Sequence, residues 1–251
     1  MFNRIKTKLE WLRHFRELDR MTSMEEFRAC VDRVQPADFL FYERLSAQKR
    51  IEVASLLNHI GFSLAGKRAM DLGPAFGDSL DIFRERGASN CCFVECEPFF
   101  YTFNRLKHFE GRRLDYIKHL DRIPPGPYDL IWAKGAVSHM EFTFSRSLLE
   151  VRASWGKAAC QRWVRRLQDL VRTDGVVVLC PWWPNDGTRR STQNVMDHWF
   201  TSTLVRLGFE PLPFLPGHNK EPEYPVTLIS SGRARELGTA APVLQSSLGE
   251  K

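Results

Sequence analysis

Two acidic residues and a glycine-containing turn mark the part of this sequence that could bind a ligand. Asp71 lies near the end of the apolar segment 68–72, and the turn after it contains Gly73 and Gly77. Glu95 closes the next apolar segment. Glycine lets a backbone approach a ligand closely, and an acid that ends the second strand of a parallel sheet is placed to accept hydrogen bonds from ribose hydroxyls. The spacing predicts a nucleoside site.

A nicotinamide dinucleotide is the alternative ligand. Its usual turn, G-x-G-x-x-G, presents a helix N-terminus to a pyrophosphate. Here the pattern from Asp71 to Gly77 is D-x-G-x-A-x-G, with an acid in front. A carboxylate in that place repels a pyrophosphate and attracts a cation. The electrostatic sign therefore favours a sulfonium nucleoside that carries an ammonium group.

The elements that must position these residues follow from hydrophobic periodicity. Residues 1–66 are predicted as a helical extension, in which Ser23 and Glu26 form a capping-box pattern and Gly61 ends a helix over 47–60. Beyond them, helices alternate with apolar strands, as in an α/β fold. We expect a Rossmann-like, seven-stranded, mostly parallel sheet with helices on both faces. The predicted strands are 68–72, 91–95, 114–118, 128–133, 176–180, 209–212 and 226–230.

Four segments in this order resemble motifs of the class I S-adenosylmethionine-dependent methyltransferases. The first motif is similar to residues 71–77, with Ala75 in place of the usual middle glycine. The others resemble residues 93–98, 128–140 and 167–180. The resemblance covers about residues 67–231 and implies a methyltransferase domain that uses S-adenosylmethionine. The tail 232–251 has no periodicity and is predicted to be disordered.

The resemblance also implies which residues hold the cofactor. Glu95 would bind both ribose hydroxyls, and Cys96 would lie against the adenine. The family often has an acid after the third strand, near the adenine amine; the place here reads 118–121, where His119 or Asp121 could serve. No metal is expected. The implied cofactor residues are Asp71, Gly73, Ala75, Gly77, Glu95, Cys96, His119, Leu120, Ala133 and Lys134.

Methyl transfer from a sulfonium is an in-line displacement for which the protein supplies orientation and a dry site. A general base helps only where the acceptor must lose a proton. His139, which follows the fourth strand, is the first candidate base, and His198 is the second, because imidazole titrates near neutral pH. A structural role for either histidine is the alternative.

Aromatic residues are predicted to line the acceptor pocket. Residues 141–159 make the connection before the fifth strand unusually long, so we expect an insertion that covers the site. Trp182 and Trp183, after that strand, could wall a ring or pack under a loop. The N-terminal helices are expected to cap the site with Phe39, Phe41 and Tyr42. The residues assigned to the acceptor are Tyr42, Phe142, Trp182 and Trp183.

Composition narrows the class of partner. The 251 residues are 43% apolar and carry a formal charge of +6, of which +4 falls in residues 136–190. No window is apolar enough to span a membrane, and residues 1–20 lack the apolar core of a secretory signal. Six cysteines without a C-x-x-C pair predict free thiols in a reducing cytoplasm.

A small-molecule acceptor, methylated at oxygen or nitrogen, is the leading hypothesis. Residues 133–136 do not match the Asp/Asn-Pro-Pro-aromatic motif of amino-methylating nucleic-acid enzymes of this fold. Two alternatives stay open. One is an RNA methyltransferase that uses the basic segment as a phosphate track, with steep salt dependence. The other is a catalytically silent binding module. A homodimer also stays open.

Overall fold

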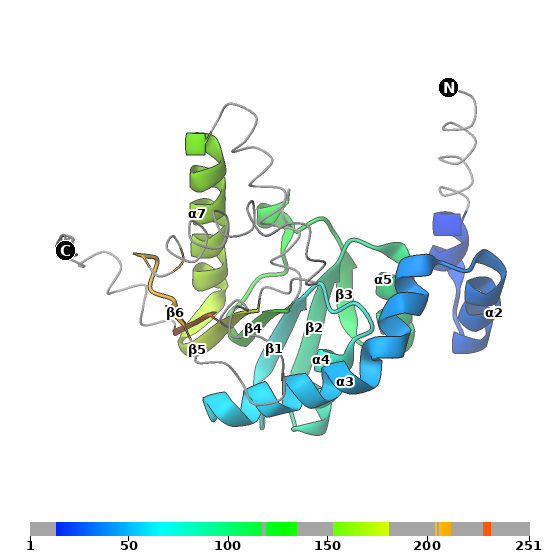
Figure 1. The fold of residues 1–251 in the computed structure, drawn as a ribbon, viewed down its shortest axis with the longest axis horizontal. Coiled ribbons are helices and arrows are strands. Elements are labelled where there is room, and N and C mark those ends of the chain that lie inside the picture. The colour runs from blue at the N-terminus through cyan, green and yellow to red at the C-terminus, as the bar shows by residue number, and fades with distance from the viewer. Residues whose placement is uncertain are drawn as a thin grey trace, which may run out of the picture.

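The computed structural model describes residues 14–116, 119–134, 153–180, 204, 206–211 and 228–231. Within them, seven strands form one sheet in the order β3-β2-β1-β4-β5-β7-β6 (Figure 1). Strands β1 to β5 pair in parallel, and β7 pairs antiparallel with both β5 and β6. The strands are β1 (Arg68–Leu72), β2 (Asn90–Glu95), β3 (Glu110–Arg113), β4 (Tyr128–Lys134), β5 (Val171–Cys180), β6 (Glu210–Pro211) and β7 (Leu228–Ser231).

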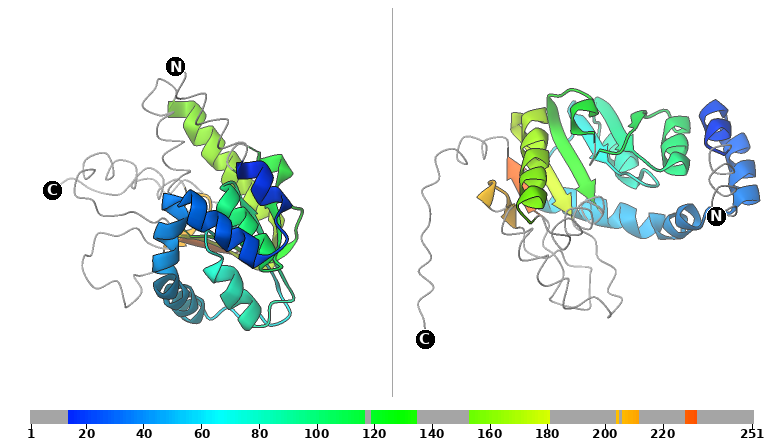
Figure 2. Two further views of the ribbon diagram at one scale, coloured as in Figure 1. Left: turned by 90° about the vertical axis from the view of Figure 1, so that its right-hand side faces the viewer. Right: turned by 90° about the horizontal axis from the view of Figure 1, so that it is seen from above.

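Helices cover both faces of this sheet, as predicted (Figure 1, Figure 2). Alternation along β1 places Met70 and Leu72 in the core beneath α7, and Ala69 in the core beneath α3 and α4. The described helices are residues 14–20, α2 (Met24–Val34), α3 (Ala37–Ile60), α4 (Asp78–Glu85), α5 (Pro98–Leu106), the 3-10 turn η1 (Leu120–Arg122) and α7 (Ala153–Leu170).

The local signals at the helix ends are confirmed. Ser23 and Glu26 form the reciprocal capping box at the start of α2, and Gly61 ends α3 in a left-handed conformation. The start of α3 differs from the prediction, since it begins at Ala37 rather than at 47. The apolar residues of its first turns pack into a separate aromatic cluster. They therefore do not share one helix face with the later apolar residues, which pack against the sheet.

The predicted third strand at 114–118 is wrong. The structure has β3 at Glu110–Arg113, a polar strand at the edge of the sheet whose residues are mostly exposed. Leu114 and Tyr116 are buried after the strand ends, and these two apolar residues produced the mistaken prediction. The edge position explains the error, because a strand that water covers needs no apolar alternation.

The helix predicted at 160–172 begins earlier and ends earlier. It is α7, Ala153–Leu170, so part of the predicted insertion 141–159 is its first turns. Residues 135–152 lie outside the described part of the chain, as do 1–13 and the tail 232–251. No helix in the described ranges is long and apolar enough to cross a bilayer. Cys30, Cys91, Cys92 and Cys96 are free thiols.

Candidate functional site

The turn between β1 and α4 lies where the strand order of the sheet reverses direction. From β1 the chain goes to β2 and β3 on one side, and β4 and β5 lie on the other side. In open α/β sheets, ligands bind beyond the carboxyl ends of the strands at such a switch point. The acid-and-glycine segment of the sequence occupies this place.

Three residues of this turn have a left-handed backbone. The φ angles are 75° at Gly73, 49° at Ala75 and 73° at Gly77. An alanine with positive φ is uncommon, and surrounding contacts must hold it there. The Gly73 amide donates to the carbonyl oxygen of Val94 at 2.8 Å, which ties the start of the turn to β2.

Glu95 holds the turn from the end of β2. One carboxylate oxygen, Oε1, accepts hydrogen bonds from the amides of Cys96 (2.8 Å) and Glu97 (2.9 Å). The other, Oε2, accepts one from the Ala75 amide at 3.3 Å. Burial raises the pKa of Glu95, and these backbone hydrogen bonds oppose the rise. A carboxylate has about four acceptor positions, so Oε2 keeps one for a ligand.

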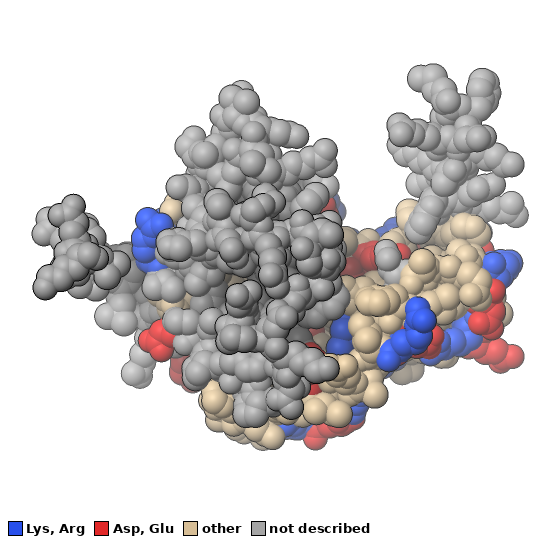
Figure 3. Space-filling view, in the orientation of Figure 1, with Lys and Arg blue, Asp and Glu red and all other residues tan. Residues whose placement is uncertain are grey.

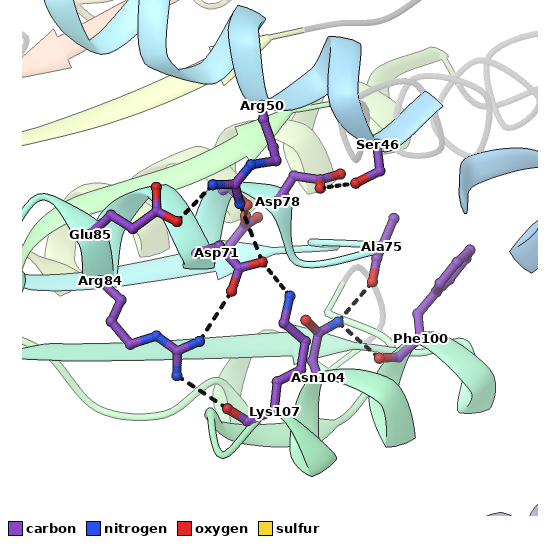
Figure 4. Close-up of polar contacts among 12 residues, drawn as sticks. Ser46, Arg50, Asp71, Ala75, Asp78, Arg84, Glu85, Phe100, Asn104 and Lys107 are labelled. Carbon is purple, nitrogen blue, oxygen red and sulfur yellow. Dashed lines mark hydrogen bonds and ion pairs between the residues drawn. The ribbon is translucent and has the colours of Figure 1, made fainter. Parts of the chain in front are cut away.

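Two buried carboxyl groups flank the same turn. The Ser79 hydroxyl donates to Oδ2 of Asp71. The Ser46 hydroxyl, on α3, donates to Oδ1 of Asp78 (Figure 4). Within the described residues, Asp71 Oδ1 and Asp78 Oδ2 are buried without a hydrogen-bond partner. Burial raises the pKa of Asp78 and raises that of Asp71 to about 8. A cation placed beside either oxygen would give it a partner.

Asn104, which was not among the predicted site residues, supports the turn from α5. Its Nδ2 donates to the carbonyl oxygens of Ala75 (2.7 Å) and Phe100 (2.9 Å), as Figure 4 shows. Asn104 is fully buried. A polar residue of low helix propensity inside the apolar stretch 98–106 was the available signal, since such a residue in a buried helix needs a partner.

The corrected β3 changes which acid follows the third strand. Asp115 comes two residues after Arg113 and is half-buried, whereas His119 and Asp121 are exposed. The pKa of Cys96 is raised to about 12, first by burial and then by the charges of Glu95 and Asp115. Cys96 is exposed as a residue although its thiol is desolvated in this way. Asp115 therefore lies near the residue that the resemblance places against adenine.

The other predicted residues are placed as follows. Ala133 is fully buried in β4, and Lys134 ends that strand. Tyr42 is half-buried, and its ring meets Phe100 edge-on at 5.5 Å between centroids. The backbone of Leu120 lies in η1. Outside the described residues lie His139, His198, Phe142, Trp182 and Trp183.

The N-terminal aromatic residues do not behave alike. Phe39 is 1% exposed inside the aromatic cluster, so its ring cannot line an open pocket. Phe41 is 44% exposed on α3. The expectation of a cap built from Phe39 is therefore corrected: a fully buried ring packs and does not meet a ligand.

The described surface carries both signs of charge. On the face in Figure 3, acidic and basic side chains are interspersed over the N-terminal helices. Arg162 and Arg165 are exposed on α7, as expected for a solvated helix face. Among the described residues, no group of three His, Cys, Asp or Glu side chains could hold a metal ion.

Of three comparisons with known proteins, one finds similar proteins. No protein-family model matches the sequence, and a search of curated proteins finds no significant match. Similar solved structures include an S-adenosylmethionine-dependent methyltransferase from Mesorhizobium loti, with 17% identity and a TM-score of 0.48 over 69% of this chain and 94% of that one. Another is a methyltransferase from Archaeoglobus fulgidus, with 16% identity and a TM-score of 0.47 over 77% and 97%.

Two larger proteins are matched over part of their length. A Galdieria sulphuraria structure is 16% identical, with a TM-score of 0.46, and the match covers 66% of this chain and 63% of that one. A Streptomyces venezuelae structure is also 16% identical, with a TM-score of 0.44, over 62% and 60%. The chain thus spans less than two thirds of either.

Proposed function

We propose that this protein transfers a methyl group from S-adenosylmethionine to a small-molecule acceptor. One observation carries the proposal. At the switch point of the sheet, a turn with three left-handed residues is tied by its Ala75 amide to the carboxylate of Glu95. Beside it, Asp71 keeps a buried oxygen without a partner. A ribose and a cationic group are what such a pair of acids can bind together.

The residues present fit this cofactor. The remaining acceptor position on Glu95 Oε2 would take a ribose hydroxyl, and the buried oxygens of Asp71 and Asp78 would face the positively charged amino-acid end. Asp115 is proposed in place of His119 or Asp121 as the residue near the adenine amine, with Cys96 against the ring. Ala133 and Lys134, at the end of β4, would border the amino-acid end.

When bound, S-adenosylmethionine supplies an electrophilic methyl group on a sulfonium. The protein contributes orientation, since the rigid turn and the two strand ends fix the direction in which the methyl group points. Acids near the site favour the cationic donor. His139 is the first candidate to remove a proton from an oxygen or nitrogen acceptor, and His198 is the second. Tyr42, Phe142, Trp182 and Trp183 are the residues proposed for the acceptor pocket.

The competing ligands fit less well. A dinucleotide fold has six parallel strands in the order 3-2-1-4-5-6, whereas here an antiparallel β7 follows β5 in the sheet. A cationic group beside Asp71 would favour the ionised form of this buried acid, whereas a pyrophosphate would disfavour it. For an RNA acceptor, the basic segment 136–190 is the proposed phosphate track, and the structure describes only residues 153–180 of it. RNA binding with a steep salt dependence would favour that alternative.

Calorimetry with S-adenosylmethionine tests the proposal. We expect the wild-type protein to bind, and Glu95→Gln to lose at least about tenfold in affinity, because hydrogen bonds to a charged partner contribute roughly 1.5–3 kcal/mol. Glu97→Gln is the matched control. Its carboxylate accepts a hydrogen bond from the Phe100 amide at the start of α5, so it should lose stability and keep its affinity. A folded wild-type protein that does not bind would refute the proposal.

A further inference from the structure

The turn between β1 and α4 has a second support, which comes from the N-terminal helices. Phe76 lies between the left-handed residues Ala75 and Gly77, and it is only 7% exposed. Its ring centroid lies 4.8 Å from that of Phe39 on α3 and 4.3 Å from that of Phe103 on α5. Phe76 therefore anchors the turn in an aromatic cluster to which α3 contributes.

Polar contacts hold the N-terminal helices on the same support. From α5, Nη2 of Arg105 donates to the carbonyl oxygens of Leu18 (3.3 Å) and Met21 (2.7 Å). At the end of β3, Nη1 of Arg113 lies 2.6 Å from Oδ1 of Asp19. These contacts join the segment from Leu18 to Met21 to α5 and β3, which follow the turn.

We propose that Phe39 is a positioning residue for the cofactor turn, which couples the N-terminal helices to cofactor binding. The inference rests on the proposed function, because it concerns the affinity for S-adenosylmethionine. Phe39 acts through Phe76 and does not itself touch the cofactor. Without its ring, the turn can leave the left-handed conformations at Ala75 and Gly77. The apparent Kd then rises in inverse proportion to the fraction of molecules whose turn is competent to bind.

Phe27 provides a matched control in the same cluster. Phe27 and Phe39 are 0% and 1% exposed, so shortening either ring leaves a similar cavity. Within the described residues, the ring contacts of Phe27 are with Phe39, Phe99 and Phe103, and not with Phe76. If only the shortening of Phe39 lowers the affinity, the loss reflects positioning of the turn and not a general loss of stability.

Calorimetry and thermal unfolding of Phe39→Leu and Phe27→Leu test the inference. Both variants should unfold at lower temperature than the wild type. Phe39→Leu should raise the Kd for S-adenosylmethionine about tenfold, within the usual range of coupling between sites, and Phe27→Leu less than about twofold. In a Phe76→Leu background, Phe39→Leu should add little further loss, since the two rings act together.

Coupling is reciprocal, so it can also be measured on the wild-type protein. This measurement does not depend on whether a variant folds. Binding S-adenosylmethionine should slow hydrogen exchange of the amides in α2 and α3. Unchanged exchange there, or equal Kd values for the two leucine variants, would overturn the inference while the wild type still binds. A wild type that does not bind the cofactor would overturn the proposed function and this inference with it.

Discussion

The side-chain amide of Asn104 donates a 2.7 Å hydrogen bond to the carbonyl oxygen of Ala75. The donor belongs to α5 and the acceptor to the turn after β1, whose conformation at Ala75 is left-handed. Glu95 binds the amide of the same alanine. Both backbone polar groups of Ala75 are thus held by side chains from elsewhere in the chain, which explains how a non-glycine residue keeps this conformation.

Asn104→Asp should weaken both the fold and the site. The substitution keeps the shape of the side chain and replaces the donating Nδ2 with an oxygen that faces the carbonyls of Ala75 and Phe100. A buried acceptor without its donor costs about 1–3 kcal/mol, and we expect weaker S-adenosylmethionine binding as well. Asn58→Asp, on the exposed side of α3, is the control. Urea unfolding and calorimetry measure the two effects, and unchanged binding in Asn104→Asp would contradict the role given to this residue.

Gly77→Ala should destabilise the protein far more than Gly61→Ala. Both glycines have positive φ, 73° and 63°, so an added methyl strains each backbone to a similar extent. At Gly77 the new Cβ would stand 1.9 Å from Oδ1 of Asn104, whereas at Gly61 nothing lies within 4 Å. The difference between the two unfolding free energies measures this clash. Adding Asn104→Ala should recover part of the loss in Gly77→Ala, and equal losses for the two glycines would refute the argument.

Asp115→Asn should lower the affinity for S-adenosylmethionine by about fivefold or more, in keeping with a hydrogen bond to a charged group. Asp121→Asn should leave the affinity unchanged, because Asp121 is exposed beyond the corrected end of β3. The two variants make the same chemical change after the same strand. Calorimetry on both decides which acid serves the adenine side, and the reverse order of effects would restore the prediction made from the sequence.

The stability of the unliganded protein should fall as the pH rises from about 4 to about 8. Burial raises the pKa of Asp71 from 3.8 to about 8, so the folded state holds a proton there that the unfolded state releases. The stability that Asp71 contributes is therefore fully present below its unfolded pKa and is lost as the pH rises through its folded pKa. Asp71→Asn should flatten this dependence in thermal unfolding, and Asp32→Asn, an exposed control, should not. Equal slopes in all three proteins would contradict a buried, protonated Asp71.

The predictable parts of the fold are those whose signal is local. The strands at β1, β2 and β4 are buried, so continuous apolar segments mark them, and Asp71 and Glu95 stand out because they are acids at the ends of such segments. The capping box at Ser23 and the left-handed Gly61 depend on neighbouring residues alone. For these features the sequence carries enough information without knowledge of the rest of the chain.

Other features depend on residues that are distant in sequence. The third strand is polar because it lies at an edge, and an edge is a property of the assembled sheet. Because this strand ends at Arg113, Asp115 is the first acid that follows it. Asn104 and Phe39 are ordinary helical residues until folding brings α5 and α3 against the turn, and then one supplies a hydrogen bond and the other a ring.

The sequence by itself determined the alternation of helices and strands, the acid-and-glycine turn, and the resemblance to methyltransferases, because periodicity and short motifs are written in neighbouring residues. Only the tertiary structure decided which side chains fix the backbone conformation of that turn and which acid follows the third strand. Both features depend on packing between segments that are far apart in the chain. The spacing of neighbouring residues does not reveal such contacts.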